Sequence, residues 1–454
     1  MTTLFVEVED LFIYARASPR PSGIQRMCFE IYSALHARYG ASGQVRFVRQ
    51  GPGPLGFRTV PWEAVLATYA DMSGPATAPL PPPPPDTPPA RHRIARHVPA
   101  RLRLAIGLFR RDLFGTVRHG AQVLIELARL LTPRKPVADD IVWTGGEDIA
   151  SLAEPGDVLV ILGSPWAQPG YAARVAALRD GQAMRVALLV HDIIPLRRPE
   201  WCNDILVRDF RNWFDSTFPL CDRILANSRY TAADVARHAE QRGQPLAHPP
   251  TVLPIGTSFT AFGPPAGNLR ADLPTPGSYV LFVSTIEARK NHVLMLRVWR
   301  RLLESMPPAD LPVLVFAGRI GWLVADLMSQ LENCRFLDGH IRIVEDPSDV
   351  ELIALYKGCL FTVFPSLFEG WGLPVSESLA MGRPCLAART TSLPESGGTL
   401  TRYFDPDNTA DATAAIRAVL DDRPGLAAWT AQVQAEYRHV PWDDTARTLM
   451  EALA

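Results

Sequence analysis

The chain has 454 residues, enough for two domains of ordinary size that each bury a core. Its formal net charge of −1 gives no general attraction to nucleic acid, so we expect no nucleic-acid partner. The six cysteines are scattered without a Cys-x-x-Cys pair, which excludes an evident disulfide framework or zinc site and indicates a reduced, cytoplasmic protein. We expect neither a signal peptide nor a membrane span, since no segment approaches roughly 18 uninterrupted apolar residues.

Strand and helix patterns alternate through residues 1–262, which we expect to form a first domain. The helices are expected near residues 23–38, 172–179, 205–214 and 231–240. The strands are expected at residues 4–8, 45–48, 158–162, 186–190, 223–226 and 252–255.

Regular structure is expected to stop after residue 48 and to resume at residue 158. Five consecutive prolines at 81–85 predict a polyproline spacer that cannot join a core. Residues 91–135 then carry eleven Lys or Arg against two acidic residues, with apolar residues at helical spacing. We therefore expect a basic helical insertion over 80–135. Two interpretations stay open: a helix on an anionic membrane surface, or a helix packed on the domain with a solvated arginine-rich face.

A stretch rich in Pro and Gly at 261–278 predicts a linker before a second domain at 278–438. Alternation with helices predicts parallel sheets, so the expected fold is α/β with two doubly wound, Rossmann-like domains. In such sheets ligands bind beyond the carboxyl ends of the strands. The strands of the second domain are expected at 279–283, 313–317, 341–344, 360–364 and 385–388.

The most specific pattern lies within residues 359–387. Glu369 and Glu377 stand eight positions apart, around a turn that contains Gly370 and Gly372, between an apolar strand and a helix. Free amides at a helix start hold an anion, and glycines let the backbone approach it closely. Carboxylates instead suit hydroxyls, because each accepts two hydrogen bonds. Phosphate beside hydroxyls indicates a nucleotide sugar as the ligand.

A pair of cations, Arg289 and Lys290, follows the predicted strand at 279–283. Two adjacent cations at a strand-to-helix turn can neutralise a departing diphosphate. The sequence has no convincing Asp-x-Asp motif, so we expect the protein to use these cations without a metal or other cofactor.

Two further candidates also follow predicted strands. His191 ends the strand at 186–190, where it can meet the transferred sugar or the acceptor, although a lone histidine is more often structural. Gly23 opens the helix after the first strand, where the backbone can clasp donor phosphate or acceptor.

The 359–387 stretch resembles the signature of glycosyltransferase family 4, the retaining transferases of GT-B fold. That signature has two glutamates with seven residues between them, in a context like PSxxEGxGLPxxEAxAxGxP. Ser378, where the family often has Ala, is a mild departure. The resemblance implies two domains that face a cleft. It also implies that the protein transfers a sugar without a metal. The positions in register are Pro365, Ser366, Glu369, Gly370, Gly372, Leu373, Pro374, Glu377, Ala380, Gly382 and Pro384.

The resemblance also implies a role for each candidate residue. Glu377 is expected to hold ribose, Glu369 and its loop the sugar, and His191 the reacting sugar. Residues 442–446 resemble the closing segment of the family, which implies that a helix at 439–454 crosses back to the first domain. The remaining donor-binding residues implied are Arg289, Lys290, the loop Gly370, Trp371, Gly372 and Leu373, and, at strand ends that line the nucleotide, Gly318, Arg319 and Val344.

We therefore expect a hexosyltransferase that moves a hexose, with mannose favoured, from a nucleoside-diphosphate sugar to a saccharide acceptor. The favoured donor is GDP-mannose, with a UDP-hexose or dTDP-rhamnose as the alternatives. A lipid-linked acceptor would suit polysaccharide assembly at the inner face of the cytoplasmic membrane, with peripheral contact through residues 91–135. Two other functions stay open: a GT-B isomerase or hydrolase of nucleotide sugars, and a non-catalytic GT-B subunit.

Overall fold

The computed structural model of the chain describes residues 2–18, 20–52, 56–73, 143–257 and 269–454. Residues 1–75 and 144–454 make one compact unit. The basic helical insertion expected over 80–135 lies outside the described residues, as does the first part of the expected linker. No helix in the described ranges is both long and apolar enough to cross a membrane.

In the described part of the first half, seven strands form one sheet in the order β3-β2-β1-β4-β5-β6-β7. All neighbours are parallel except the β2–β3 pair, which is antiparallel. The central strands are continuous apolar runs because helices cover both faces of a doubly wound sheet. The strands are β1 (Leu4–Glu7), β2 (Val45–Gln50), β3 (Phe57–Thr59), β4 (Val158–Ile161), β5 (Arg185–Val190), β6 (Arg223–Ala226) and β7 (Thr251–Val252).

Helices of the first half pack on this sheet through apolar faces. Phe210, Trp213 and Phe214 of α7, for example, are buried against a core that includes Leu159 and Leu188 of the sheet. The helices are α1 (Glu9–Ala17), α2 (Gly23–Leu35), α3 (Trp62–Ser73), α5 (Tyr171–Gln182), α6 (Ile194–Arg197), α7 (Asp204–Thr217) and α8 (Arg229–Gln241).

In the second half, the described strands form a six-stranded sheet in the order β10-β9-β8-β11-β12-β13, and every neighbouring pair is parallel. The switch in strand order falls between β8 and β11, the place where doubly wound sheets bind ligands. The strands are β8 (Tyr279–Val283), β9 (Val313–Ala317), β10 (Ile341–Val344), β11 (Thr362–Phe364), β12 (Cys385–Ala388) and β13 (Arg402–Phe404).

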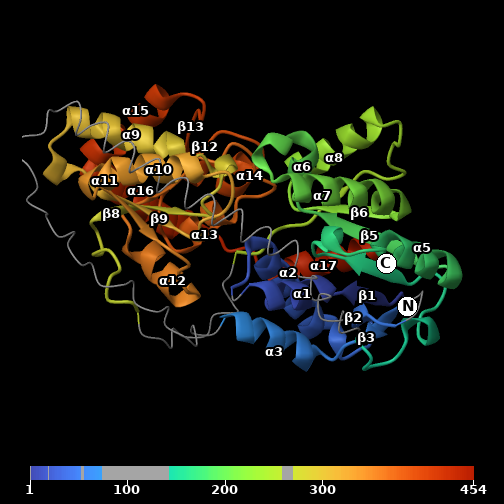
Figure 1. Ribbon diagram of the computed structural model, residues 1–454. Coiled ribbons are helices and arrows are strands. Elements are labelled where there is room, and N and C mark those ends of the chain that lie inside the picture. The colour runs from blue at the N-terminus through green and yellow to red at the C-terminus, as the bar shows by residue number, and fades with distance from the viewer. Residues whose placement is uncertain (1, 19, 53–55, 74–142, 258–268) are drawn as a thin grey trace, which may run out of the picture. The chain divides into compact units, whose positions relative to one another are not determined.

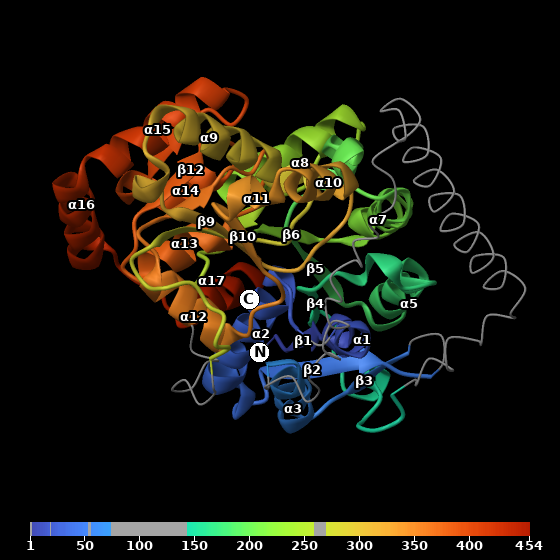
Figure 2. The ribbon, with the colours of Figure 1, turned by 60° about the vertical axis from the view of Figure 1, so that its left-hand side comes forward.

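The helices of the second half complete its core around the fully buried Trp299, whose indole N–H donates to the carbonyl oxygen of Pro312 at 3.0 Å. Helices α9 and α15 lie side by side in both views (Figures 1 and 2). The helices are α9 (His292–Ser305), α10 (Ala325–Asn333), the short turn α11 (Arg335–Asp338), α12 (Asp349–Gly358), α13 (Leu373–Ala380), α14 (Leu393–Gly397), α15 (Thr409–Asp421), α16 (Arg423–Glu436) and α17 (Trp442–Leu453).

The last helix, α17, lies beside α2 of the first half (Figure 1). The Thr445 hydroxyl donates to the carbonyl oxygen of Pro254 at 2.5 Å, and Arg38 pairs with Asp443 at 2.7 Å. The C-terminal end of the chain is therefore part of the packing of the first half.

The two parallel, doubly wound sheets confirm the expected fold class. Three local expectations were wrong. Regular structure does not stop after residue 48, because β3 and α3 follow. The strand expected at 252–255 is only β7, Thr251–Val252, and the short strand β13 was not expected at all. All three of these strands lie at sheet edges, where a strand needs only one partner and leaves a weak apolar pattern.

Candidate active site

Two neighbouring strands of the second sheet carry the principal candidate residues beyond their carboxyl ends. After β8 the chain turns through a 3-10 helix (Ala288–Lys290) that carries Arg289 and Lys290. After β11 it enters the loop that carries Glu369. Because β8 and β11 pair directly, the two loops meet above the same edge of the sheet.

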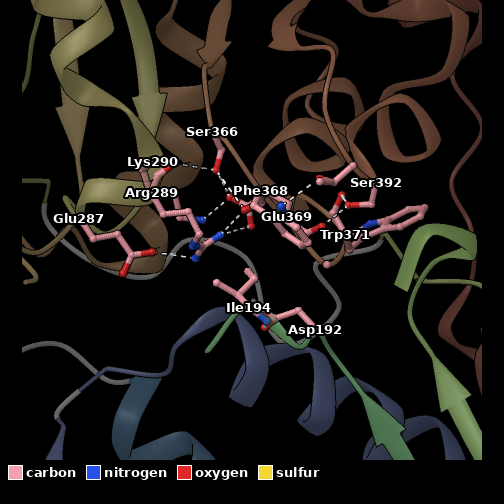
Figure 3. Close-up of polar contacts among 12 residues, drawn as sticks. Asp192, Ile194, Glu287, Arg289, Lys290, Ser366, Phe368, Glu369, Trp371 and Ser392 are labelled. Carbon is pink, nitrogen blue, oxygen red and sulfur yellow. Dashed lines mark hydrogen bonds and ion pairs between the residues drawn. The ribbon is translucent and has the colours of Figure 1, made fainter. Parts of the chain in front are cut away.

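Glu369 lies between the two cations (Figure 3). Lys290 Nζ is 2.6 Å from Glu369 Oε1, and an Arg289 nitrogen is 2.8 Å from Glu369 Oε2. The hydroxyl of Ser366 donates to Oε1 at 2.6 Å. The structure thus brings three of the predicted residues into one buried, charge-assisted cluster.

The cluster fixes the ionisation of its members. Burial alone would raise the pKa of Glu369, but the charges of Arg289 and Lys290 lower that pKa to about 2. Burial and the adjacent Arg289 lower the pKa of Lys290, while Glu369 opposes the shift. Burial would lower the pKa of Arg289, but Glu369 and Glu287 raise it. Glu369 is therefore a carboxylate, and an acceptor only, at neutral pH.

The loop after Glu369 requires its glycines. A Cβ atom on Gly370 would lie 1.9 Å from the carbonyl oxygen of His191. Gly372 caps α13 with a φ of +102°, and a Cβ there would lie 2.4 Å from a methyl group of Leu393. The hydroxyl of Ser392 donates to the carbonyl oxygens of Glu369 (2.9 Å) and Trp371 (3.0 Å). These contacts hold the loop at the positive end of α13, next to Leu373.

Glu377 lies one turn into α13 and has a different environment. The hydroxyl of Tyr356 donates to its carboxylate at 2.7 Å. Burial raises the pKa of Glu377, and the charge of Arg26 opposes that shift. Arg26 itself pairs with Asp349. Glu377 and Arg26 line a small cavity of about 40 Å³, and Glu369 is not among the residues that line it.

His191 follows β5 and is buried. Its Nε2 lies 2.7 Å from the carbonyl oxygen of Leu162. A carbonyl oxygen can only accept, so Nε2 carries the proton and Nδ1 is left with a lone pair. That buried Nδ1 has no hydrogen-bond partner among the described residues. Burial lowers the pKa of His191, which keeps the ring neutral and its Nδ1 an open acceptor.

The remaining predicted residues lie apart from the ion cluster. Gly318 has a φ of +150°, and a Cβ there would lie 2.0 Å from the carbonyl oxygen of Ser284. The amide of Gly318 donates to the carbonyl oxygen of Val344 at 3.0 Å. Arg319 binds the hydroxyls of Tyr14 (2.8 Å) and Ser18 (3.2 Å) in the first half.

Gly23 opens α2, and a Cβ there would lie 3.5 Å from Leu373, in ordinary contact. Gly23 thus lies at a helix start beside Leu373, but α2 is not the helix that directly follows the first strand, because α1 lies between β1 and α2.

Sequence reasoning assigned no role to four residues of the candidate site. Asp192, next to His191, accepts the amide of Ile194 at 3.0 Å, and burial raises the pKa of Asp192 (Figure 3). Glu287 pairs with Arg289, two positions along the chain. The closeness of these opposite charges in the sequence is the signal that could have indicated the pair. Ser366 and Tyr356 hold the two signature glutamates, but only the fold brings Tyr356 to Glu377.

Comparison with known proteins agrees with this geometry. Residues 270–435 match the family described as Glycosyl transferases group 1. The chain is 28% identical over 258 residues to the serotype-specific mannosyltransferase WbdA of Escherichia coli, a match that covers 55% of this chain and 31% of that protein. It is 31% identical over 172 residues to O-antigen chain mannosyltransferase B of Escherichia coli, covering 38% of this chain and 44% of that protein. The chain thus spans less than half the length of these curated relatives.

Among solved structures, Anabaena Alr3699/HepE in complex with UDP is similar over 100% of this chain and 99% of that one. Its TM-score is 0.54 at 13% identity, so this likeness shows the fold alone. The two parallel, doubly wound sheets have the fold of the GT-B class, and the family match covers residues 270–435. Residues 270–435, which carry the ion cluster, are similar to group 1 glycosyl transferases, and mannosyltransferases are among the proteins that the chain resembles.

Proposed function

We propose that the protein is a retaining hexosyltransferase that uses a nucleoside-diphosphate sugar as donor and a saccharide as acceptor. The observation that carries this proposal is the Glu369 carboxylate clamped by Arg289 and Lys290 beside the start of α13. This cluster lies inside the segment that matches Glycosyl transferases group 1. It offers positive charge to a diphosphate and a fixed carboxylate to a sugar.

Lys290 and the helix start are proposed to hold the diphosphate. An ammonium group has three N–H donors, and Glu369 takes one of them, so two can reach phosphate oxygens. The positive end of α13 adds to that field. These groups would stabilise the charge that grows on the leaving oxygen, which is the task of a divalent ion in metal-dependent transferases. The proposed reaction is therefore metal-independent.

The proposed transfer takes place on one face of the sugar. The bond from the anomeric carbon to the phosphate oxygen breaks while the acceptor hydroxyl forms its bond on the same face. The proton of that hydroxyl passes to the departing phosphate oxygen, so no side-chain nucleophile is required and the configuration is retained.

Other residues are proposed to orient the donor. Glu377 accepts hydrogen bonds from ribose hydroxyls, and Glu369 accepts them from the sugar. The open Nδ1 lone pair of His191 supports a hydrogen bond from a sugar hydroxyl. Eight further residues are proposed to line the bound nucleotide or to form the loop beside it: Gly23, Gly318, Arg319, Val344, Gly370, Trp371, Gly372 and Leu373.

The favoured donor is GDP-mannose, because two of the relatives are mannosyltransferases. A UDP-hexose and dTDP-rhamnose are the competing donors. A thermal-shift panel of GDP, UDP and dTDP separates them, since the nucleotide that binds the native state raises the melting temperature by mass action. The largest shift is expected with GDP, and a shift with UDP or dTDP alone would reassign the donor.

The acceptor is proposed to be lipid-linked, and the protein to act at the inner face of the cytoplasmic membrane. The support is the excess of Lys and Arg in residues 91–135, which attracts anionic lipid. A variant without residues 81–135 should pellet less with anionic vesicles than the full chain does. Equal pelleting would remove the membrane role from this segment.

The transferase activity itself is tested with a labelled donor, with and without a mannosyl acceptor. Transfer that requires the acceptor supports the proposal. Acceptor-free epimerisation or hydrolysis would favour the isomerase or hydrolase alternative, and nucleotide binding without turnover would favour the non-catalytic subunit.

A further inference from the structure

Arg289 is tied to the protein at three points (Figure 3). One nitrogen is 2.7 Å from Glu287 Oε1, and another is 2.8 Å from Glu369 Oε2. The second of these also donates to the carbonyl oxygen of Phe368 at 2.7 Å. A planar guanidinium held on two edges by such contacts cannot turn without breaking one of them.

Lys290 differs from Arg289 in this respect. Among the described residues its ammonium group contacts one protein oxygen, Glu369 Oε1, and Nζ lies 5.3 Å from the centre of the Phe364 ring. It therefore keeps donors for a ligand, whereas the donors of Arg289 are largely directed at protein acceptors.

Glu287 has the burial expected of a structural partner, because only 3% of its surface is exposed. Its charge cancels that of Arg289 locally, which weakens the pull of Arg289 on an incoming diphosphate. Along the cluster the charges alternate in the order Glu287, Arg289, Glu369, Lys290. The backbone of Glu369 is separately anchored through Thr391 and Ser392. Arg289 thus holds the Oε2 atom of the Glu369 carboxylate, while Lys290 and Ser366 hold Oε1.

We propose that Glu287 is a positioning residue for sugar transfer, which holds Arg289 so that Arg289 orients Glu369 and the carbonyl of Phe368 instead of binding the leaving phosphate. The inference rests on the proposed transferase function, and it assigns the diphosphate to Lys290 and the helix start. Glu287 acts through Arg289, since among the described residues its side chain contacts the cluster at that guanidinium.

The first test measures nucleotide binding in the full chain by calorimetry with GDP and with UDP. For the nucleotide that binds, Lys290→Ala should raise the dissociation constant about tenfold or more. Arg289→Ala and Glu287→Ala should change it by less than about threefold. An Arg289→Ala variant that loses as much affinity as Lys290→Ala would overturn the proposal, because Arg289 would then be a phosphate ligand. This arm needs no catalysis.

The second test measures turnover. Glu287→Ala should lower kcat about tenfold with the donor KM changed by less than about twofold, because orientation of Glu369 matters in the transition state. Glu287→Gln keeps an oxygen acceptor for Arg289 and should recover most of kcat. Adding Glu287→Ala to Arg289→Ala should have no further effect. Glu304→Gln, an exposed carboxylate on α9, is the matched control.

The outcomes separate the two claims. If the wild type transfers sugar and Glu287→Ala has the same kcat, the positioning role of Glu287 is overturned and the proposed function stands. An additive double variant would do the same. A wild-type protein without transfer from any donor would contradict the proposed function, and the binding arm would still decide the role of Arg289. Should Glu287→Ala fail to fold, Glu287→Gln and Arg289→Ala carry the comparison.

Discussion

Glu369 stays ionised in a buried place because two cations and a hydroxyl surround its carboxylate. An unpaired carboxylate at 7% exposure would instead be driven toward its neutral form. The same pairing keeps Lys290 and Arg289 charged until a ligand arrives. The site is thus organised before the donor binds, and the donor has only to replace part of an existing set of contacts.

Lys290 is expected to be the main electrostatic contact of the leaving group. Lys290→Ala should lower kcat about a hundredfold, corresponding to about 3 kcal/mol of lost transition-state stabilisation. Arg300→Ala, an exposed cation on α9, is the control. Steady-state kinetics with the true donor provides the measurement. Turnover of Lys290→Ala within about twofold of the wild type would remove this residue from the site.

Replacing the two signature glutamates should change different kinetic constants. Glu377 is assigned to ribose, which is held alike in the ground and transition states, so Glu377→Ala should mainly raise the donor KM. Glu369 is assigned to the reacting sugar, so Glu369→Ala should mainly lower kcat. The measurement is the split of kcat and KM in both variants. If both variants show only weaker donor binding, the division of roles is wrong.

His292 makes stability depend on pH. It is buried, stacks on Phe282 at 4.2 Å and contacts Ser284, and burial lowers its pKa from 6.5 to about 3. Because the folded pKa lies below the unfolded one, the unfolded chain binds the extra proton between these values. The contribution of His292 to the free energy of unfolding is therefore fully present above about pH 6.5. Below that pH it decreases by up to about 1.4 kcal/mol for each unit by which the pH is lowered.

The variant His292→Gln should remove this part of the slope. Urea unfolding at pH 6.5, 5.5 and 4.5 measures the effect, with the exposed His248→Gln as control. His292→Gln should be less stable at pH 6.5 but should lose less stability on acidification. Parallel slopes in the variant and the wild type would show that His292 is not the buried titrating group.

At the scale of elements, the loop between β11 and α13 depends on close backbone approach. Gly370→Ala would place a methyl group 1.9 Å from the carbonyl oxygen of His191, so the loop must move and carry Glu369 with it. We expect a loss of turnover of about tenfold or more together with a lower melting temperature. Gly156→Ala, where φ is +92° but a Cβ meets nothing within 4 Å, controls for backbone strain without a clash and should leave turnover unchanged. Unchanged kinetics in Gly370→Ala would contradict the tight approach.

The sequence was informative where strands are buried on both faces. The ranges 279–283, 313–317 and 385–388 coincide with β8, β9 and β12, because a parallel strand in the middle of a sheet is an unbroken apolar run. The range 341–344 coincides with β10, although β10 lies at a sheet edge. The edge strands β3, β7 and β13 have two or three residues each and leave too little pattern to recognise.

The sequence singled out the two glutamates and the two cations of the candidate site, but it did not predict their contacts or their other partners. The glutamates and the two cations stand out by spacing and by their place after strands. The ion pair of Lys290 with Glu369 joins residues 79 positions apart, and only the pairing of β8 with β11 brings them together. The open lone pair of His191 depends on the carbonyl of Leu162, which no local pattern indicates.

At the scale of the whole molecule, residues from both halves contact the signature segment. Glu395 of α14 accepts the amides of Arg229 (2.9 Å) and Tyr230 (2.8 Å) at the start of α8. Thr231 of the same helix donates to the carbonyl oxygen of Gly370 at 3.2 Å. The loop that we assign to the donor therefore also contacts the half that we assign to the acceptor, as transfer between two bound sugars requires.

The most direct test of the central claim is the fate of a labelled donor in the presence of EDTA. The full chain is incubated with GDP-mannose, UDP-glucose or dTDP-rhamnose and a mannosyl acceptor, and proton NMR follows the anomeric signals. We predict one donor whose sugar appears on the acceptor in the anomeric configuration that it had in the donor, with equal amounts of nucleoside diphosphate released. A product of inverted configuration, turnover without acceptor, or activity that EDTA abolishes and Mg²⁺ restores would contradict a metal-independent retaining transferase.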